Sequence, residues 1–474
     1  MGVTTTHLNE RLELFEGVYS AERQSELESL GRIYNPSLGP ATAVNLHRPD
    51  PFDLSMHSSF GTHSTVGRIM RDLTVKAGIA DAIIVPGGGK GASMRQPFLG
   101  ALGELAERLL AVLHYAGIAT DLVNASYAEL IAEGRRALGP DELPLFAPEQ
   151  YARPNFAYTP FEADTPLRWI EGRDLLTGEP VMVPAQLVLI YYKHHPTEAH
   201  IGYPTTGGLA FHHDRNRALL HGLYEYIERD AINVRWYCRI ETPRVEIDLD
   251  AFLRRSLDMR HMRLRTATIP EIALFLNTLD IPIPILTAIA IDHSRRERSF
   301  LGGGGAWSTR ERALSQALFE LGQSRTALKF YRSIGLKDIR PDSTIGEMTD
   351  FFDAAIFMGF RENLPRLDWY LGSSQRIAWD DVPTSRSADE ETELRTALDR
   401  IGALGIRPIA FDMTGACWPG IWVTKVFIPE LTQACVPSHP YLGHPRYTEL
   451  PFRLGLAPRP LSFADLNTDP VPFP

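Results

Sequence analysis

The stretch that decides the fold runs from Pro86 to Leu113 and reads PGGGKGASMRQPFLGALGELAERLLAVL. Its first part is rich in glycine and holds one lysine, Lys90, and its second part is mostly apolar. Leucine and alanine recur there at helical spacing, which predicts a buried helix over 99–113. Glu104 and Glu107 stand three residues apart and therefore leave that helix on one face. Because buried carboxylates are costly without a counter-charge, a cation or several donors are expected beside them.

The same arrangement occurs twice more, in residues 205–229 and 302–325. Aligned on their helices, GALGELAER, HGLYEYIER and QALFELGQSR share one layout. That layout is a carboxylate, then Glu or Gln three residues later, and then an arginine. The corresponding residues of the second and third segments are Glu225, Glu228 and Arg229, and Glu320, Gln323 and Arg325. The three segments are too unevenly spaced for a solenoid, whose period would be constant.

Composition and charge set broad limits. With 474 residues the chain is long enough for two or three average domains or for one large one. Its net charge of −10 argues against a protein that binds nucleic acid by neutralising phosphates. The three widely spaced cysteines fit neither a disulfide framework nor a zinc motif and are expected to be reduced thiols. Without a visible signal peptide or a long apolar run, the sequence predicts a cytoplasmic protein with no membrane partner.

Helix and strand patterns alternate along the chain. Residues 1–58 are expected to be an N-terminal extension or linker, and residues 59–474 one large domain with a proline-rich tail. A hairpin is predicted around Thr177–Gly178, and a helix over 388–405 from its acidic first turn and exit glycine. The glycine-rich segments are expected to be loops. Strands are predicted at 82–85, 281–294, 407–414 and 421–430. The predicted class is α/β, with α+β left open, in which helices cover a sheet.

Four glutamates on two helices, with neighbouring arginines and a lysine in a glycine-rich loop, suit a polyphosphate bound with Mg²⁺. Mg²⁺ prefers hard oxygen ligands, while lysine, arginine and loop N–H groups meet phosphate oxygens. The standard nucleotide motifs are missing, since GGGKGAS lacks the Ser or Thr that follows a P-loop lysine and no GxGxxG opens these helices. The alternative is that each ExxER is a local salt-bridge cluster, an explanation that suits one helix better than three.

At these segments the sequence resembles the YcaO family. The recurring features of that family are a GKG loop followed by a small-Ala-x-x-Glu-x-x-Glu-Arg helix, a second ExxER helix and a third helix with ExxQSR. Here they correspond to Gly89–Gly91, Gly100–Arg108, Glu225–Arg229 and Glu320–Arg325. The last residues, Pro470 to Pro474, form the PxPxP ending of the azoline-forming branch. One departure is Gly207, where the family often has Asn before Gly-Leu-Ala.

The resemblance implies an ATP-dependent cyclodehydratase that acts on a ribosomally made precursor peptide, as in the synthesis of thiazole/oxazole-modified microcins and other bacteriocins. A Cys, Ser or Thr side chain attacks the preceding amide carbonyl, the amide oxygen is phosphorylated by ATP, and phosphate leaves to give thiazoline or oxazoline. By carry-over, Arg325 and Pro474 are the expected catalytic residues. The residues expected to bind the ATP and Mg²⁺ cofactors are Lys90, Gln323 and Arg325, with Glu104, Glu107, Glu225 and Glu228 holding the metal.

The resemblance also implies partners. These are the precursor peptide, a leader-binding protein resembling ubiquitin-activating enzymes, and a flavin dehydrogenase; a homodimer is left open. Thioamidation and macroamidine formation remain alternative YcaO reactions, against which the PxPxP ending argues. A non-catalytic nucleotide-binding scaffold is a further alternative, against which the intact carboxylates argue. The tail is expected to lie near the nucleotide and, lacking an apolar pattern, to add little to the core.

Overall fold

The computed structural model describes most of the chain from residue 87 onward and a few short pieces before it. The described ranges are 33–34, 41, 43–47, 57–63, 87–255, 272–293, 296–297, 299–333, 338–415 and 420–473. The predicted strand 82–85 lies outside them, as does most of the predicted extension 1–58. The proposed boundary between residues 58 and 59 therefore stays a prediction.

Three sheets form the framework of the described residues. The first contains β1 (Ala43–His47), β2 (His57–His63) and β3 (Gly88–Gly91). The second has the order β11 (Phe300–Ala306), β10 (Ile285–Ile291), β9 (Ile272–Leu276), β8 (Arg244–Glu246) and β12 (Arg376–Ala378). The third has the order β4 (Val123–Ala125), β5 (Leu167–Asp174), β13 (Ile409–Asp412), β14 (Trp422–Phe427) and β7 (Leu209–His212), with β6 (Pro180–Pro184) paired to β5. Pairing between these strands is antiparallel except between β8 and β12, so the expected mixture of helix and sheet takes its α+β form.

Helices of very different lengths surround these sheets. The long ones are α4 (Arg95–Ile118), α8 (Arg215–Tyr237), α10 (Arg310–Ser333) and α13 (Glu390–Gly402). Shorter ones are α5 (Tyr127–Ala132), α6 (Pro148–Tyr151), α7 (Ala185–Val188), α9 (Leu249–Arg255), α11 (Phe351–Met358), α12 (Asp368–Leu371), α14 (Pro445–Thr448) and α15 (Leu450–Arg453). Short 3-10 helices lie at Pro140–Glu142, Ile345–Glu347, Arg361–Leu367, Trp379–Asp381 and Phe463–Asp465.

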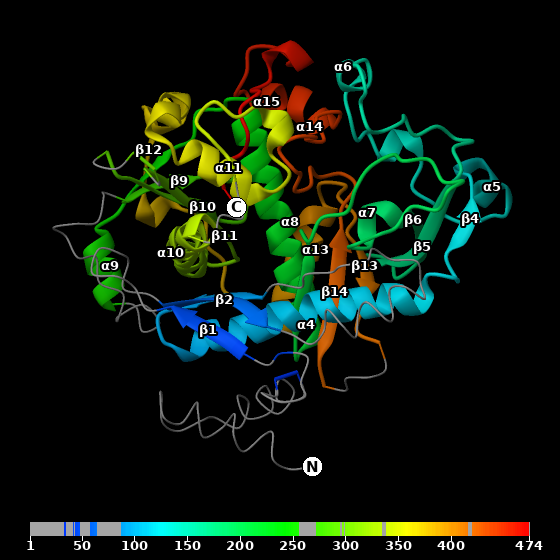
Figure 1. Ribbon diagram of the computed structural model, residues 1–474, viewed down its shortest axis with the longest axis horizontal. Coiled ribbons are helices and arrows are strands. Elements are labelled where there is room, and N and C mark those ends of the chain that lie inside the picture. Colours follow the sequence, from blue (N-terminus) through cyan, green and yellow to red (C-terminus); the bar gives the residue numbers. More distant parts are fainter. Residues whose placement is uncertain are drawn as a thin grey trace.

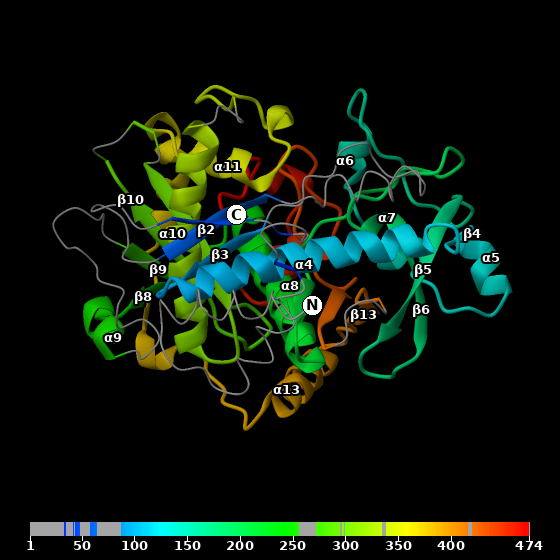
Figure 2. The same ribbon diagram turned by 60° about the horizontal axis from the view of Figure 1, so that its bottom comes forward.

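The helices α4, α8 and α10 are the three that the repeated layout predicts, and they are arranged in a cycle. α4 contacts β3 and β7, α8 contacts β7 and β11, and α10 contacts β11 and β3. Figure 1 shows α4 along the lower edge, α8 rising in the centre and α10 to one side. In Figure 2, α4 crosses the front of the molecule from β2 and β3 toward β4 and β5. Each of the strands β3, β7 and β11 thus contacts two of the three helices, and the helices enclose a common region.

Each glycine-rich segment together with the helix that follows it is called a unit below. The glycine-rich segments of the first and third units are strands, which corrects the expectation that they are loops. They form β3 and the inner part of β11. A Cβ on Gly89 would stand 1.9 Å from the carbonyl oxygen of Pro97 in α4, and one on Gly303 would stand 2.2 Å from the backbone nitrogen of Leu321 in α10. Glycine is therefore needed where helix backbone lies directly on strand backbone.

Other local predictions are confirmed. The hairpin at Thr177–Gly178 joins β5 to β6, with Gly178 at a φ of +78°. α13 begins after Asp389, whose side chain accepts a hydrogen bond from the backbone N–H of Thr392. Cys238 and Cys435 are buried free thiols, and Cys417 lies outside the described residues.

No helix among the described residues is both long and apolar enough to span a bilayer.

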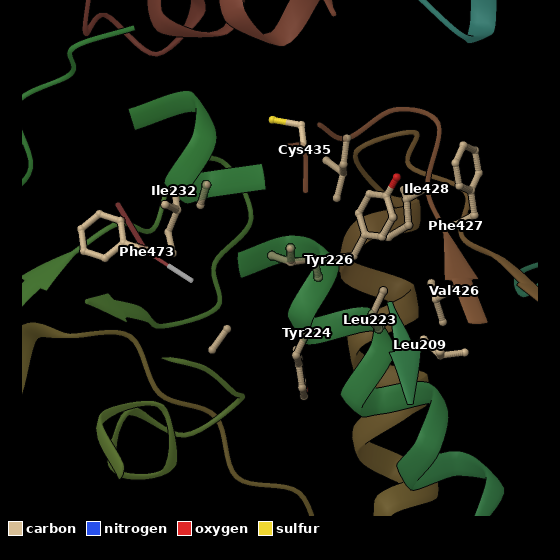
Figure 3. Close-up of a cluster of buried hydrophobic side chains, with 14 of the residues drawn as sticks. Leu209, Leu223, Tyr224, Tyr226, Ile232, Val426, Phe427, Ile428, Cys435 and Phe473 are labelled. Carbon is tan, nitrogen blue, oxygen red and sulfur yellow. The ribbon is translucent and has the colours of Figure 1, made fainter. Parts of the chain in front are cut away.

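The core joins α8 to the sheet that contains β7 and β14. Figure 3 shows Leu223 and Tyr226 of α8 beside Leu209 of β7 and Val426 of β14, all of them buried. Complete burial of one such side chain stabilises the fold by about 1.5–3 kcal/mol. The same helix carries Glu225 and Glu228, so this apolar packing determines where the two carboxylates lie.

Candidate functional site

Carboxylates from α4, α8 and α10 come together in the region that the three helices enclose. Glu225 of α8 is near enough to Glu107 of α4 for its charge to raise the pKa of Glu107. The charge of Glu320 in α10 raises the pKa of both Glu225 and Glu228. Glu104 acts on Glu107 in the same way. These five residues, Glu104, Glu107, Glu225, Glu228 and Glu320, are called the carboxylate cluster below.

In each of the three helices, the first glutamate of the repeated layout accepts a hydrogen bond from a glycine N–H on the preceding strand or turn. The bonds run from Gly88 to Glu104 (2.5 Å), from Gly208 to Glu225 (3.2 Å) and from Gly304 to Glu320 (2.7 Å), each to the Oε2 atom. The glycine lies 16 or 17 residues before its glutamate in every case. The repeated sequence layout thus corresponds to a repeated geometry, in which a backbone donor orients one carboxylate oxygen.

Cations from different elements lie beside the same carboxylates. Arg108 forms an ion pair with Glu104 one turn earlier on α4. Lys90 of β3 donates from Nζ to Oε1 of Glu320 at 3.1 Å, so it links the first unit to the third. Burial tends to lower the pKa of Arg229, but the nearby Glu228, Glu320 and Glu225 raise it overall.

Burial and the mutual repulsion of the carboxylates favour the protonated form of several of them. Burial raises the pKa of Glu228 to about 8, with Arg229 opposing the rise and Glu320 adding to it. Burial, and then the charge of Glu104, raise the pKa of Glu107 well above its usual value. Burial also raises the pKa of Glu225. A bound cation would favour the ionised form of these groups.

The residues present fit Mg²⁺ held together with phosphate. Among the described residues, no three His, Cys, Asp or Glu side chains gather closely enough to hold a metal ion by themselves. Mg²⁺ is usually held by only one or two carboxylates, with water and substrate phosphates completing its coordination. Carboxylates on several helices, with Lys90 and Arg229 beside them, suit that mode. The assignment of Glu104, Glu107, Glu225 and Glu228 to the metal remains a prediction.

The structure brings most of the predicted site residues together. The four predicted metal ligands and Lys90 all belong to, or contact, the carboxylate cluster. Gln323 also reaches this region, since a Cβ on Gly88 would stand 2.8 Å from its Nε2 atom. Arg325 is buried on α10, two residues beyond Gln323 and therefore on another side of the helix. Pro474 lies outside the described residues.

The proline-rich tail contributes to the core, which corrects the expectation that it adds little. Phe473 is 1% exposed, and its ring packs near those of Trp236, Phe300 and Tyr370. Its carbonyl oxygen accepts a hydrogen bond from Nη1 of Arg229 at 3.2 Å. Pro470 and Pro472 are buried with it, and Phe473 is the one aromatic residue of the segment. In Figure 3 it is labelled near Ile232 of α8, away from the solvent.

Two residues of the site, Glu320 and Lys425, have no role in the sequence analysis. Glu320 occupies the first carboxylate position of the repeated layout, so the alignment of the three helices contains its signal. Arg229 is expected there to meet phosphate, but its contact with Phe473 spans 244 residues and has no local signal. Lys425 of β14 has no local signal at all, yet its charge acts on Glu225 and Glu107.

Comparison with known proteins agrees with this geometry. Residues 88–432 match the model of a family described as "YcaO cyclodehydratase, ATP-ad Mg2+-binding". An uncharacterised protein of Methanothermobacter thermautotrophicus is 27% identical over 271 residues, which cover 56% of this chain and 65% of that protein. An uncharacterised protein encoded in the tfuA 3′ region of Rhizobium leguminosarum bv. trifolii is 28% identical over 249 residues, or 50% of this chain and 54% of that protein. The chain thus spans less than two thirds of either curated relative.

Solved structures share the fold. A heterocyclase in complex with substrate and cofactor superimposes with a TM-score of 0.71 at 21% identity, covering 94% of this chain and 57% of that one. YcaO from Methanopyrus kandleri, bound with AMPPCP and Mg²⁺, gives a TM-score of 0.54 at 19% identity, covering 82% and 86%. The E. coli microcin synthetase McbBCD complex with pro-MccB17 bound gives 0.56 at 14% identity, covering 93% and 98%. Because the family model matches well over half of the sequence, the chain belongs to the YcaO family, whose domain binds ATP and Mg²⁺.

Proposed function

We propose that the protein is an ATP-dependent cyclodehydratase that converts Cys, Ser or Thr of a ribosomal precursor peptide to thiazoline or oxazoline. The side-chain sulfur or oxygen forms a bond to the preceding amide carbon. The amide oxygen then accepts the γ-phosphoryl group of ATP and departs as phosphate, so each ring costs one ATP and the peptide loses one water. ATP supplies the phosphoryl group that makes a poor leaving group a good one, and Mg²⁺ neutralises its charge.

The observation that carries the proposal is the junction at Arg229. Its guanidinium lies among Glu225, Glu228 and Glu320 and also donates to the carbonyl of Phe473 in the PxPxP tail. A feature of the azoline-forming branch is thereby joined to the carboxylate cluster. Apolar packing of Phe473 alone would not require this hydrogen bond, so the contact with Arg229 relates the tail to the site as well as to the core.

The residues of the chain would act mainly by binding and orientation. Glu104, Glu107, Glu225 and Glu228 would hold Mg²⁺, each first glutamate being oriented by its glycine N–H. Lys90, Gln323 and Arg325 would bind the nucleotide. Catalysis of phosphoryl transfer depends on such positioning and on charge neutralisation more than on covalent chemistry by the protein. Pro474, next to the anchored Phe473, is proposed to act at the same place.

The expected partners follow from the same proposal. The heterocyclase neighbour was solved with its substrate and the microcin synthetase as a complex with pro-MccB17, which supports a peptide substrate and partner proteins here. A leader-binding partner resembling ubiquitin-activating enzymes and a flavin dehydrogenase are the proposed kinds, and the protein is proposed to work in the cytoplasm as one YcaO domain over 59–474.

The test is reconstitution with the precursor peptide, the leader-binding partner, ATP and Mg²⁺, followed by mass spectrometry and nucleotide analysis. The expected result is the loss of one water per modified residue with parallel release of ADP and phosphate. Exchange of oxygen for sulfur would instead indicate thioamidation, and AMP with pyrophosphate another route of activation. Tight binding of ATP without turnover would indicate a nucleotide-binding scaffold.

A further inference from the structure

Lys425 is a buried cation in the sheet beside the carboxylate cluster. It is 2% exposed and lies on β14, opposite Leu209 of β7. Its ammonium group donates to two backbone carbonyls, those of Thr205 at 2.6 Å and Gly207 at 2.5 Å. Both carbonyls belong to the turn that leads into β7. One side chain therefore holds this turn from the neighbouring strand.

The turn held by Lys425 is the one that orients Glu225. Gly208 has a φ of +81°, and a Cβ on it would stand 2.3 Å from the carbonyl oxygen of Val426. Its own carbonyl accepts from the backbone N–H of Val426 at 2.8 Å. Its N–H donates to Oε2 of Glu225 at 3.2 Å. If the carbonyls of Thr205 and Gly207 lost their shared donor, the N–H of Gly208 would no longer be aimed at Glu225.

The charge of Lys425 also bears on the cluster. Carbonyl oxygens accept its hydrogen bonds but do not neutralise its charge. Burial lowers the pKa of Lys425 to about 8, and the carboxylates that oppose this are Glu225 of α8 and Glu107 of α4. The other two first glutamates have a cation as well, since Arg108 pairs with Glu104 and Lys90 with Glu320. At Glu225, Arg229 and, less strongly, Lys425 favour the ionised carboxylate.

A buried cation that only supports backbone carbonyls behaves differently, and Arg235 is an example. Arg235 is 5% exposed and donates to the carbonyls of Asn277, Glu241 and Thr278. Burial lowers its pKa to about 10, and among the described residues Tyr370 opposes this. No carboxylate of the cluster acts on it. Arg235 therefore serves as the matched control for Lys425.

We propose that Lys425 is a positioning residue of the carboxylate cluster, which holds the turn 205–208 so that Gly208 orients Glu225 and which places a positive charge near that carboxylate. This role deepens the proposed function, because it rests on the cluster as the place where Mg²⁺ and ATP bind. The backbone carbonyl of Gly207 is one of the two that Lys425 holds from β14.

The test compares Lys425→Met, Lys425→Gln and Arg235→Met with the wild type. Methionine removes both the donors and the charge, whereas glutamine keeps two amide hydrogens and removes only the charge. Two properties are measured on the full chain. The first is the affinity for a non-hydrolysable ATP analogue with Mg²⁺, by calorimetry. The second is amide hydrogen exchange over 205–212 in the protein without nucleotide.

Lys425→Met is expected to weaken binding by about 10–100-fold, as is typical for loss of a residue that orients a metal ligand. It is also expected to speed amide exchange in the turn. Lys425→Gln is expected to bind more weakly than wild type and to leave exchange closer to normal. Arg235→Met is expected to lower stability without changing either property.

Wild-type affinity and exchange in Lys425→Met would overturn the proposal, and so would equal effects in Arg235→Met. Failure of both Lys425 variants to fold would also overturn it, because a general structural role would then account for the residue. If the wild type itself does not bind the analogue, the proposed function fails, and the exchange measurement still decides whether Lys425 holds the turn.

Discussion

Replacing Phe473 by alanine should destabilise the protein substantially, although the residue lies next to the end of the sequence. The ring is 1% exposed and lies 6.0–6.4 Å, between ring centroids, from Trp236, Phe300 and Tyr370. A Cβ on Gly302 would stand 2.8 Å from its Cδ1 atom, so β11 leaves room for this ring by having glycine there. Truncation of a core phenylalanine to alanine costs about 3–5 kcal/mol. Since about 1.4 kcal/mol is a factor of ten, the folding equilibrium should shift by more than a hundredfold.

The measurement is unfolding in urea. If the dependence of the free energy of unfolding on urea concentration (the m value) is the same for both proteins, the change in stability is read from the shift in midpoint. Phe452→Ala is the control, because Phe452 is 48% exposed and its loss should cost no more than about 0.5 kcal/mol. Azoline formation by Phe473→Ala should fall more steeply than stability alone explains, because the carbonyl held by Arg229 would lose its anchor. Equal midpoints for the two variants would refute the assignment of the tail to the core.

Glu228→Gln or Glu104→Gln should lower ATP consumption by at least ~10–100-fold while the fold is retained. Glu246→Gln is the control, because Glu246 is exposed and its replacement should have no effect. Wild-type turnover in Glu228→Gln and Glu104→Gln would contradict the metal assignment. The protein without metal should lose stability as the pH rises from 4.5, the usual carboxyl pKa, through about 8, the pKa of Glu228 in the folded state. Over that range the folded protein keeps a proton on Glu228 that the unfolded chain has already lost. Unfolding midpoints measured across the range should decline less steeply in Glu228→Gln. Gly303→Ala should destabilise the protein by about 1–3 kcal/mol or more, because the new methyl group would clash with α10. Gly117→Ala in α4 is the control: a Cβ there would meet nothing within 4 Å, and the change should stabilise the protein by about 0.5–1 kcal/mol. Similar unfolding midpoints for the two variants would contradict the packing argument.

The sequence alone determined the three long helices and the polar pairs on them. Spacings of three and four residues are local, and in a helix they place Glu104 with Glu107, and Glu225 with Glu228, on one face whatever the rest of the chain does. The capping of α13 by Asp389 and the hairpin at Gly178 are local in the same sense. The repeated layout also indicated that the three helices have equivalent roles.

Only the tertiary structure decided how these units meet. Nothing in GGKG or GGGGA distinguishes a phosphate-binding loop from a strand on which a helix packs, because both need residues without a Cβ. The close approach of Gly89 to Pro97 is what selects the strand. The pairing of Lys90 with Glu320 spans 230 residues, and the two carbonyls held by Lys425 lie 218 and 220 residues away. Contacts over such distances depend on sheet order and helix packing, which no local spacing encodes. For the same reason a single phenylalanine in a proline-rich tail gave no sign that it would be buried against α8.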